Sequence, residues 1–500
     1  ILSLIEHQIE DSWEKSYLET LITTKFQHEA RDEIMIPSRL EKRLMSIYLM
    51  RTRIDDPFQA EKSRRNALAL AVFNSSACHE AINHVYAQDL ERPPDTLADI
   101  KSLIAAVEFK RLLCLACAMQ LWQKNESADF DKADYLNLFS QPFEGDGLGP
   151  LLDVLGFRER HRPKQKILWL ADEAGETTLD LMVIRFLVAH GHKVILAAKA
   201  GPLYTKTTID DLLNDPVLQS VLGQAAVIDN PELSKNELVR TLRGDVQILV
   251  LSDGTSEKTN LLLCSTTFAR IFKEVDLVIS RGLDQRRRFF ETHFQFTQDI
   301  FNISTLDDGQ ISILRKPRHP EVIKFSHRDL EAKAQNIIDQ MKASQDQGMT
   351  VIFYSGIIGS IPGKIQMAKK IMSVFVNHLK SQSAKTFIIN PSEYYEPGMD
   401  ADDLMYMWEI VQRSGRIDIW RFQTYDDIVT AFQIMDQKIP PEWVGKDATY
   451  STGCTKEMGI AIDVQHRHPE MQIIGPARER FMRRKEYGVG MMFDRRLSGS

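Results

Sequence analysis

The spacing of apolar residues changes along this chain. Up to about residue 150, apolar positions recur at helical spacing, as in KRLMSIYLMRTRI and LADIKSLIAAVEFKRLLCLACAMQLWQK, and predict an N-terminal helical domain. Beyond it, short apolar runs alternate with helical segments, which is typical of parallel strands connected by helices. These runs cover residues 167–171, 194–198, 226–228, 247–251, 277–280 and 311–314. We therefore predict an α/β fold with a doubly wound, mostly parallel sheet.

The last third of the chain repeats the same alternation. Strand-like runs at 350–354, 386–390, 418–422 and 472–474 are separated by helical patterns near 365–380, 402–413 and 425–435. This pattern indicates either an additional α/β domain or an extension of the first sheet. The predicted domains are thus 1–150 (helical), 151–320 (α/β) and 321–500 (further α/β).

Acidic residues follow the first strand-like run of the α/β region directly. Asp172 and Glu173 come after residues 167–171, and a helical pattern and a second apolar run follow them. A strand-helix-strand unit makes the two strands parallel, and ligands of open parallel sheets bind at the carboxyl ends of the strands. Asp172 and Glu173 therefore mark a candidate site.

Composition narrows the class of protein. A net charge of −7 and a pI near 6.1 argue against a dedicated nucleic-acid binder, which usually carries a basic excess. No apolar run approaches the roughly 18 to 20 residues that span a bilayer, and the start lacks the basic region of a signal peptide. The five cysteines are scattered, and Cys114 and Cys117 lie in an apolar helical pattern that favours buried thiols. We expect a cytoplasmic protein that binds neither membrane nor nucleic acid.

Several short motifs, in order along the chain, resemble the damage-control phosphatase family, also described as acidic-residue-methyltransferase-like or domain of unknown function 89. They are Asp56-Pro57-Phe58 with Lys62, Asn66, Ala69 and Leu70; Asp172-Glu173-Ala174-Gly175-Glu176; Lys199-Ala200-Gly201-Pro202 with Thr208 and Asp211; Gly254, Thr259, Asn260, Ser265 and Phe268; and Asp276-Leu277-Val278-Ile279-Ser280-Arg281-Gly282. The resemblance covers roughly residues 40 to 316. Each motif is weak alone, but their shared order and spacing are fairly specific.

The resemblance implies a divalent-metal-dependent phosphatase that acts on a small phosphorylated metabolite. The metal would be Mn, Mg, Co or Ni, and it would polarise the phosphoryl oxygen and activate water. Carried over to this chain, the family pattern assigns Asp172 and Glu173 to the metal, Lys199, Gly201, Arg281 and Gly282 to the substrate, and Asp172, Lys206 and Asp284 to catalysis. The competing hypothesis is a catalytically degenerate member that binds a phosphorylated ligand or a protein partner without turnover.

The departures from the family pattern concern its metal ligands. Glu173 replaces an asparagine, and Lys206 stands where a carboxylate ligand is expected, although an ammonium group cannot ligate a hard cation. A metal could still bind through Asp172 and Glu173, with Asp210, Asp211 or Asp284 completing the oxygen shell. Alternatively, Lys206 fills the vacated position and pairs with a carboxylate, or it extends into solvent. The sequence leaves these three arrangements open.

The last third carries its own candidate features. Residues 355–364 form a glycine-rich turn between a strand and a helix, which would suit an anion, although the spacing misses that of a Walker loop. A simple connecting turn is the alternative. His466 and His468 are more typical of a surface turn than of a metal site, and the basic segment 478–485 could meet an acidic partner or simply be solvated. A protein partner would therefore engage the C-terminal region.

Overall fold

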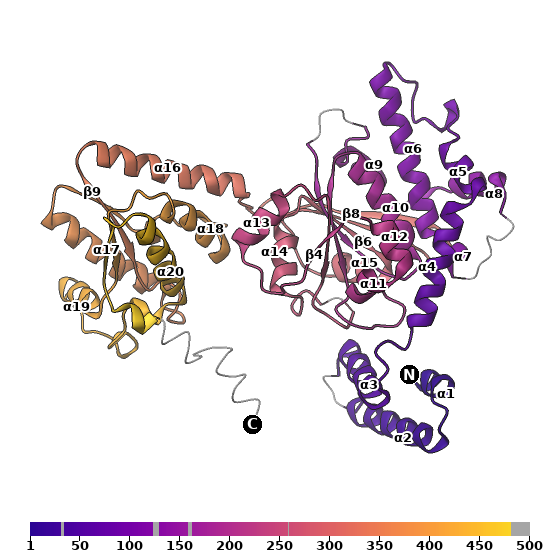
Figure 1. Cartoon of the computed structure of the whole chain (residues 1–500), viewed down its shortest axis with the longest axis horizontal. Coiled ribbons are helices and arrows are strands. Elements are labelled where there is room, and N and C mark those ends of the chain that lie inside the picture. The colour runs from indigo at the N-terminus through magenta and orange to yellow at the C-terminus, as the bar shows by residue number, and fades with distance from the viewer. Residues whose placement is uncertain (32–34, 124–129, 159–162, 259, 482–500) are drawn as a thin grey trace. The chain divides into compact units, whose positions relative to one another are not determined.

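The computed structural model describes residues 1–31, 35–123, 130–158, 163–258 and 260–481. The chain divides into two compact units, Ile1–Val322 and Ile323–Ser500, called here the first and second units (Figure 1). Each unit has a sheet of its own, so the C-terminal third is a further α/β body and not an extension of the first sheet. The helices predicted for residues 1–150 belong to the first unit together with the large sheet.

The sheet of the first unit has eight strands in the order β1-β8-β7-β6-β2-β3-β5-β4. The strands are β1 (Phe143–Glu144), β2 (Lys166–Leu170), β3 (Lys193–Ala198), β4 (Ala226–Ile228), β5 (Ile248–Ser252), β6 (Leu277–Arg281), β7 (Asp299–Thr305) and β8 (Ile311–Lys316). Every pairing is parallel except that of β7 with β8. The predicted doubly wound, mostly parallel α/β fold is therefore confirmed.

Helices cover both faces of this sheet (Figure 1). The helices of the first unit are α1 (Leu2–Gln8), α2 (Ser12–Glu29), α3 (Pro37–Thr52), α4 (Gln59–Asn74), α5 (Ser76–Asn83), α6 (Leu97–Cys117), α7 (Met119–Trp122), α8 (Lys132–Phe139), α9 (Leu148–Val154), α10 (Glu176–Ala189), α11 (Ile209–Asn214), α12 (Pro216–Leu222), α13 (Lys235–Arg243), α14 (Thr266–Glu274) and α15 (Gly282–Phe290), with a 3-10 turn η1 (Ala87–Asp89). Of these, α1, α2 and α3 pack against one another around an apolar cluster of their own. No helix within the described ranges is both long and apolar enough to cross a membrane.

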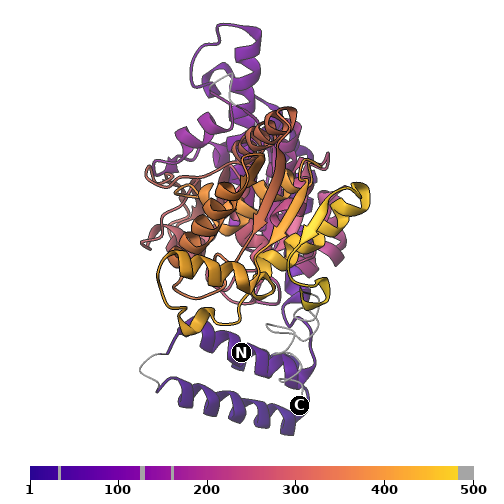
Figure 2. The same ribbon diagram turned by 90° about the vertical axis from the view of Figure 1, so that its left-hand side faces the viewer.

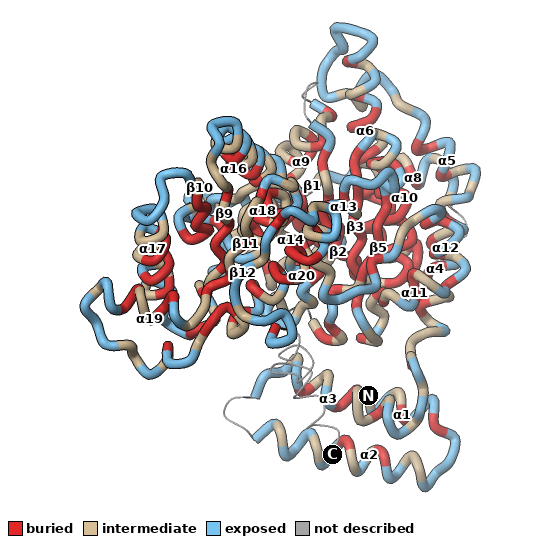
Figure 3. The backbone as a smooth tube through the Cα atoms, turned by 60° about the vertical axis from the view of Figure 1, so that its left-hand side comes forward, coloured by how far each residue is buried: buried red, intermediate tan, exposed pale blue. Residues whose placement is uncertain are grey.

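The strand β2 shows how the core is divided between the two faces. Ile167 and Trp169 belong to the apolar cluster that includes α6 and α10, whereas Leu168 and Leu170 belong to the cluster that includes α14. Alternate side chains of a strand point to opposite faces, so a strand buried on both faces is apolar throughout. Figure 3 shows the resulting continuous burial of the central strands. Such a strand holds its carboxyl end rigidly, and the candidate site follows that end.

The second unit is built on a four-stranded parallel sheet in the order β10-β9-β11-β12 (Figure 2). Its strands are β9 (Thr350–Ser355), β10 (Thr386–Ile389), β11 (Ile419–Phe422) and β12 (Gln472–Ile474). Its helices are α16 (His327–Asp346), α17 (Ile365–Gln382), α18 (Ala401–Gln412), α19 (Tyr425–Ile434) and α20 (Thr452–Arg467), with the 3-10 turns η2 (Pro391–Glu393), η3 (Pro441–Trp443) and η4 (Ala448–Tyr450). Each strand predicted in this region is present in the structure.

Two predictions from the sequence fall partly beyond the described residues. Thr259, one of the motif residues, lies outside them, and so does the basic segment from residue 482 onward.

Cys114 and Cys117 are buried in α6, as the apolar pattern predicts, and burial raises the pKa of both thiols. High thiol pKa values are typical of structural cysteines and not of reactive ones.

Candidate functional site

A loop formed by residues 199–208 crosses the carboxyl end of β2 and is held there by backbone hydrogen bonds. The amide of Thr207 donates to the carbonyl of Asp172 at 2.8 Å, and the amide of Ala174 donates to the carbonyl of Thr205 at 2.8 Å. An antiparallel bridge pairs Glu173 with Lys206. In such a bridge the paired residues lie directly opposite each other. The fold therefore sets Lys206 beside the two acidic residues that follow β2.

The ammonium group of Lys206 lies between the carboxylates of Asp172 and Glu173. Its Nζ atom is 2.6 Å from Asp172 Oδ1 and 3.0 Å from Glu173 Oε1, and the three side chains are 15%, 10% and 23% exposed. The other oxygen of Glu173 accepts a hydrogen bond of 2.5 Å from Thr205 Oγ1 and lies 3.4 Å from a guanidinium nitrogen of Arg65. Of the three arrangements left open above, the structure shows Lys206 paired with the carboxylates.

The pKa values of these groups follow from burial and mutual attraction. Burial opposes the charge of Lys206, but the two carboxylates outweigh it and raise the pKa of the ammonium group well above its usual range. Burial likewise penalises ionised Glu173, yet Lys206 and the Thr205 hydroxyl lower the pKa of that carboxyl group. Burial raises the pKa of Asp172 to about 6, with Lys206 acting in the opposite direction. At neutral pH the two negative charges are therefore balanced by Lys206 and Arg65.

The residues of this cluster, as they are arranged, do not fit a divalent cation. The ammonium nitrogen takes the position between the two carboxylates, and it offers no lone pair to a metal. Within the described ranges, no group of three or more His, Cys, Asp or Glu side chains is placed to hold a metal ion. The oxygen donors considered for completing the shell have other neighbours: Asp210 accepts from Asn214, Asp211 pairs with Lys62, and Asp284 lies 3.8 Å from Lys258.

A glycine lets a second strand end approach Asp172 closely. Strand β6 pairs with β2, and the residue after it, Gly282, has a φ of +79°. A Cβ atom at this position would lie 2.0 Å from Asp172 Oδ2, so only glycine fits both the conformation and the space. Helix α15 begins at Gly282, and its amino end has no side-chain cap. The partial positive charge of that helix end favours an anion beside it.

Arg281, predicted to contact the substrate, lies in the interior of the first unit. Its side chain is fully buried, and its guanidinium group donates to Asp180 Oδ2 at 3.0 Å and to Glu176 Oε1 at 2.8 Å. A third hydrogen bond of 3.1 Å reaches the carbonyl of Ile303. The donors of Arg281 are thus directed at internal partners, and the substrate contact expected of it is not provided by this position.

Lys199 and Gly201, the other residues predicted to contact the substrate, occupy the start of the loop 199–208. Lys199 is buried, and its ammonium group is 2.8 Å from Asp253 Oδ2 and 3.2 Å from Thr255 Oγ1. Gly201 is half-buried, and a Cβ atom there would meet Ser256 at 3.3 Å. The structure therefore brings together Asp172, Glu173, Lys206 and Gly282, while Lys199 and Arg281 serve separate internal ion pairs.

Helix α4 supplies residues that the sequence reasoning matched to a motif without giving them a role. Lys62 is fully buried and bridges Asp56 at 2.6 Å and Asp211 at 2.8 Å. Asn66 Oδ1 accepts from the amide of Gly175 at 2.7 Å and from Thr178 Oγ1 at 3.1 Å. Lys and Asn four positions apart lie on one face of a helix. That spacing was the available signal that both side chains face the α/β region, where Lys62 contacts Asp211 and Asn66 contacts the turn after β2.

Residues 5–329 match the family model described as the damage-control phosphatase ARMT1-like domain. Among solved structures, the chain is similar to a DUF89 family protein from Pyrococcus horikoshii with 17% sequence identity and a TM-score of 0.41, over 63% of this chain and 94% of that chain. None of the curated proteins matches the chain.

Proposed function

The chain belongs to the damage-control phosphatase ARMT1-like domain family, and from this premise we propose that it binds a small phosphorylated molecule without turnover. In this proposal Lys206 is the resident cation of the site, in the place where the family generally uses a divalent metal. The chain is then a phosphatase-like protein whose site binds the phosphorylated molecule but does not hydrolyse its phosphate ester.

The position of Lys206 carries the proposal. Two adjacent carboxylates attract a metal when no other positive charge is near them. Here the ammonium group of Lys206 already supplies that charge, 2.6 Å and 3.0 Å from the two carboxylates. Arg65, 3.4 Å from Glu173, supplies the second positive charge. A divalent cation would have to displace Lys206 and would leave its ammonium group buried without a partner, which costs several kcal/mol.

The surroundings of the cluster remain suited to a phosphate group. Helices α10 and α15 both begin at this end of the sheet, at Glu176 and Gly282, and amino ends of helices favour anions. Lys206, 15% exposed, supports a bound phosphate as a point charge. Hydrolysis is not expected, because a single ammonium group carries half the charge of a divalent metal and coordinates no water for attack.

The second candidate function is the metal-dependent phosphatase acting on a small phosphorylated metabolite. It is favoured by Asp284, whose negative charge is close enough to raise the pKa of Asp172, so that three carboxylates lie at this end of the sheet. In that case Lys206 would turn away from the pair, and Asp172 and Glu173 would hold Mn, Mg, Co or Ni, which would supply Lewis-acid chemistry. Lys206 would then offset charge on the phosphate.

One experiment separates the two functions. Binding of a panel of sugar and nucleotide phosphates is measured by calorimetry, and phosphate release is measured in parallel, with EDTA or with each of the four metals. We expect binding in EDTA and no release in any condition. Release that requires a metal and is lost in Asp172→Asn would establish the metal-dependent phosphatase instead.

A matched pair of variants tests the role of Lys206 in the same assay. Lys206→Asp supplies the missing carboxylate, and we expect it to bind Mn²⁺ at least tenfold more tightly than the natural protein does. Lys101→Asp, the same substitution at an exposed position near the amino end of α6, serves as the control and should leave the metal affinity of the carboxylate pair unchanged. Equal metal affinity of the natural protein and Lys206→Asp would contradict the proposal.

A further inference from the structure

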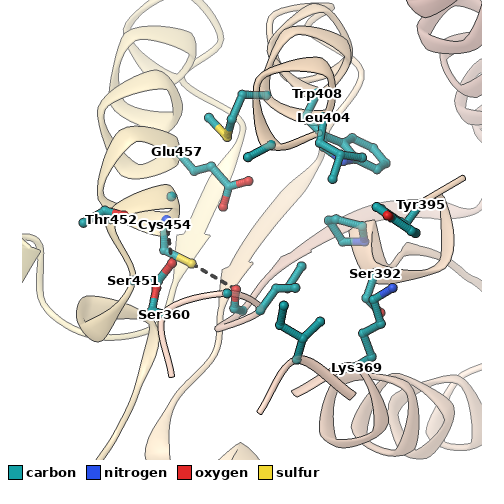
Figure 4. Close-up of a pocket in the computed structure, with 18 of the residues that line it drawn as sticks. Ser360, Lys369, Ser392, Tyr395, Leu404, Trp408, Ser451, Thr452, Cys454 and Glu457 are labelled. Carbon is teal, nitrogen blue, oxygen red and sulfur yellow. Dashed lines mark hydrogen bonds between the residues drawn. The ribbon is translucent and has the colours of Figure 1, made fainter. Parts of the chain in front are cut away.

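The second unit contains a cavity of about 710 Å³ that the proposed function does not use. It lies at the carboxyl end of the sheet and draws its lining from the glycine-rich turn after β9, the segment after β10, and the first turns of α17, α18 and α20 (Figure 4). Small-molecule sites commonly measure about 300 to 1,000 Å³. The volume therefore suits a metabolite larger than a simple ion.

The topology of the sheet explains why the cavity forms there. Strand β9 lies between β10 and β11, so the chain leaves β9 toward one neighbour and later returns to its other side. Helix α17 packs with α19, whereas α18 packs with α16 and α20. In doubly wound sheets the turns diverge at such a reversal of strand order, and ligands bind in the crevice outside it.

The wall of the cavity is mainly apolar and has aromatic rings. Trp408 is held by edge contacts with Phe353 and Tyr394, and Leu404 lies beside it on the same wall (Figure 4). Lys369 projects over the ring of Tyr395, with its ammonium nitrogen 4.3 Å from the ring centre. A rigid indole next to an aliphatic side chain suits a flat, largely apolar ring. The ammonium group of Lys369 suits a negatively charged substituent of such a ligand.

One buried carboxyl group points into this cavity. Glu457, on α20, is 8% exposed, and Figure 4 shows its carboxyl group directed at the space between Trp408 and Cys454. Gln412 Nε2 donates to one of its oxygens at 3.0 Å, and Ser355 and Cys454 are further hydrogen-bond partners of this carboxyl group. Burial raises its pKa to about 7. These three partners carry no positive charge, so a ligand that donates further hydrogen bonds to Glu457 would stabilise its ionised form.

We propose that this cavity binds a nucleoside, with the base against Trp408 and Leu404 and the ribose hydroxyls donating to Glu457. A carboxylate accepts hydrogen bonds from adjacent ribose hydroxyls, as acidic residues do in dinucleotide-binding folds. A base supplies the flat ring that the aromatic wall suits. A 5′-phosphate, when present, lies on the side of Lys369. The second unit is thus a nucleoside-binding module joined to the phosphatase-like unit.

The test is calorimetric titration of the full chain with adenosine, guanosine, cytidine and uridine and with their 5′-monophosphates. We expect saturable binding of at least one base, and at least tenfold weaker binding in Glu457→Gln, because a hydrogen bond to a charged group contributes about 1.5 to 3 kcal/mol. Glu470→Gln, an equal change at an exposed position of the same unit, is the control and should bind like the natural protein. No saturable binding of any compound overturns the proposal.

A second measurement does not depend on any variant folding. The 2′,3′-dideoxy form of the best ligand is titrated into the natural protein, and we expect at least a tenfold loss because the hydroxyl donors are missing. Undiminished binding of this analogue overturns the assignment of Glu457. Tighter binding of the monophosphate, lost in Lys369→Met, identifies a nucleotide as the ligand, whereas equal affinities identify the nucleoside.

Discussion

Replacing Lys206 by methionine tests the charge balance of the site most directly. Methionine keeps the length and the apolar stem of the side chain but leaves Asp172 and Glu173, now 10% and 23% exposed, without the cation that lies 2.6 Å and 3.0 Å away. Removal of one partner of a buried ion pair costs about 3 to 5 kcal/mol. Glu173 keeps its contacts with Arg65 and Thr205, so we expect the lower end of that range.

The assay is thermal unfolding at neutral pH and low salt, in EDTA. A loss of about 3 kcal/mol lowers the midpoint by roughly 4 °C for a unit that spans Ile1–Val322, because the entropy of unfolding is about 2.1 cal/mol/K per residue. Lys258→Met is the matched control, because Lys258 is 39% exposed and its distance of 3.8 Å from Asp284 makes a weak ion pair. Exposed pairs contribute about 1 kcal/mol or less. The variants differ only in which cation is removed.

The same variant gives a second readout with metal ions. Once the ammonium group is gone, Mn²⁺ can occupy the space between the carboxylates, and a ligand at 100 times its Kd stabilises a protein by about 2.7 kcal/mol. We expect added Mn²⁺ to restore most of the lost stability in Lys206→Met and to leave the natural protein unchanged. A midpoint for Lys206→Met within 2 °C of the Lys258→Met control would refute the argument that Lys206 balances the pair.

Three further predictions concern the groups around the site. In denaturant titrations, Gly282→Ala should destabilise the protein by at least about 2 kcal/mol more than Gly309→Ala does. Both positions have positive φ, but only Gly282 has a carboxylate oxygen 2.0 Å from the new Cβ atom. Equal losses of stability in the two variants would contradict the steric argument. Burial raises the pKa of Glu176 to about 8, so the folded state holds this proton more tightly than the unfolded state does, and stability should fall as pH rises from about 4.5 through 8. Glu176→Gln should flatten that fall by up to about 1.4 kcal/mol per pH unit, and an unchanged pH profile would contradict it. Asn66→Ala removes hydrogen bonds to Gly175 in the turn after β2, to Thr178 in α10 and to Asp215, and it should cost about 2 to 3 kcal/mol in the same titrations. A loss below about 0.5 kcal/mol would count against the role of helix α4.

The strands that could be predicted are those in which a short, mainly apolar run lies between turn residues. β4 and β12 were predicted at the residues they occupy, because such a run is typical of a strand. β7 was missed because Asn302 and Ser304 interrupt its pattern, although both are buried. Asn302 donates to the carbonyls of Ser280 and Gly282, so its partners are supplied by a neighbouring strand that the local sequence does not reveal.

The site could be located from the sequence, but the partners of its charged groups could not. Asp172 and Glu173 were identified because they end a predicted buried strand, and the structure brings Lys206 to them. Arg281 was assigned to the substrate because it stands where the family pattern has a cation. Its partners, Glu176 and Asp180, lie four residues apart on α10, and this spacing places both carboxylates on one helix face. Which face meets Arg281 depends on packing between distant segments.

The loop 199–208 makes the cation of this site part of the polypeptide. Lys206 is tethered to the carboxylates through the bridge with Glu173, so its local concentration is fixed by the fold and not by the surroundings. A free ion exchanges with its pool, can be removed by chelators and competes with other ions, whereas a tethered ammonium group does none of these. The charge state of the site is therefore expected to be insensitive to metal supply, and a protein built in this way keeps one electrostatic form wherever it is found.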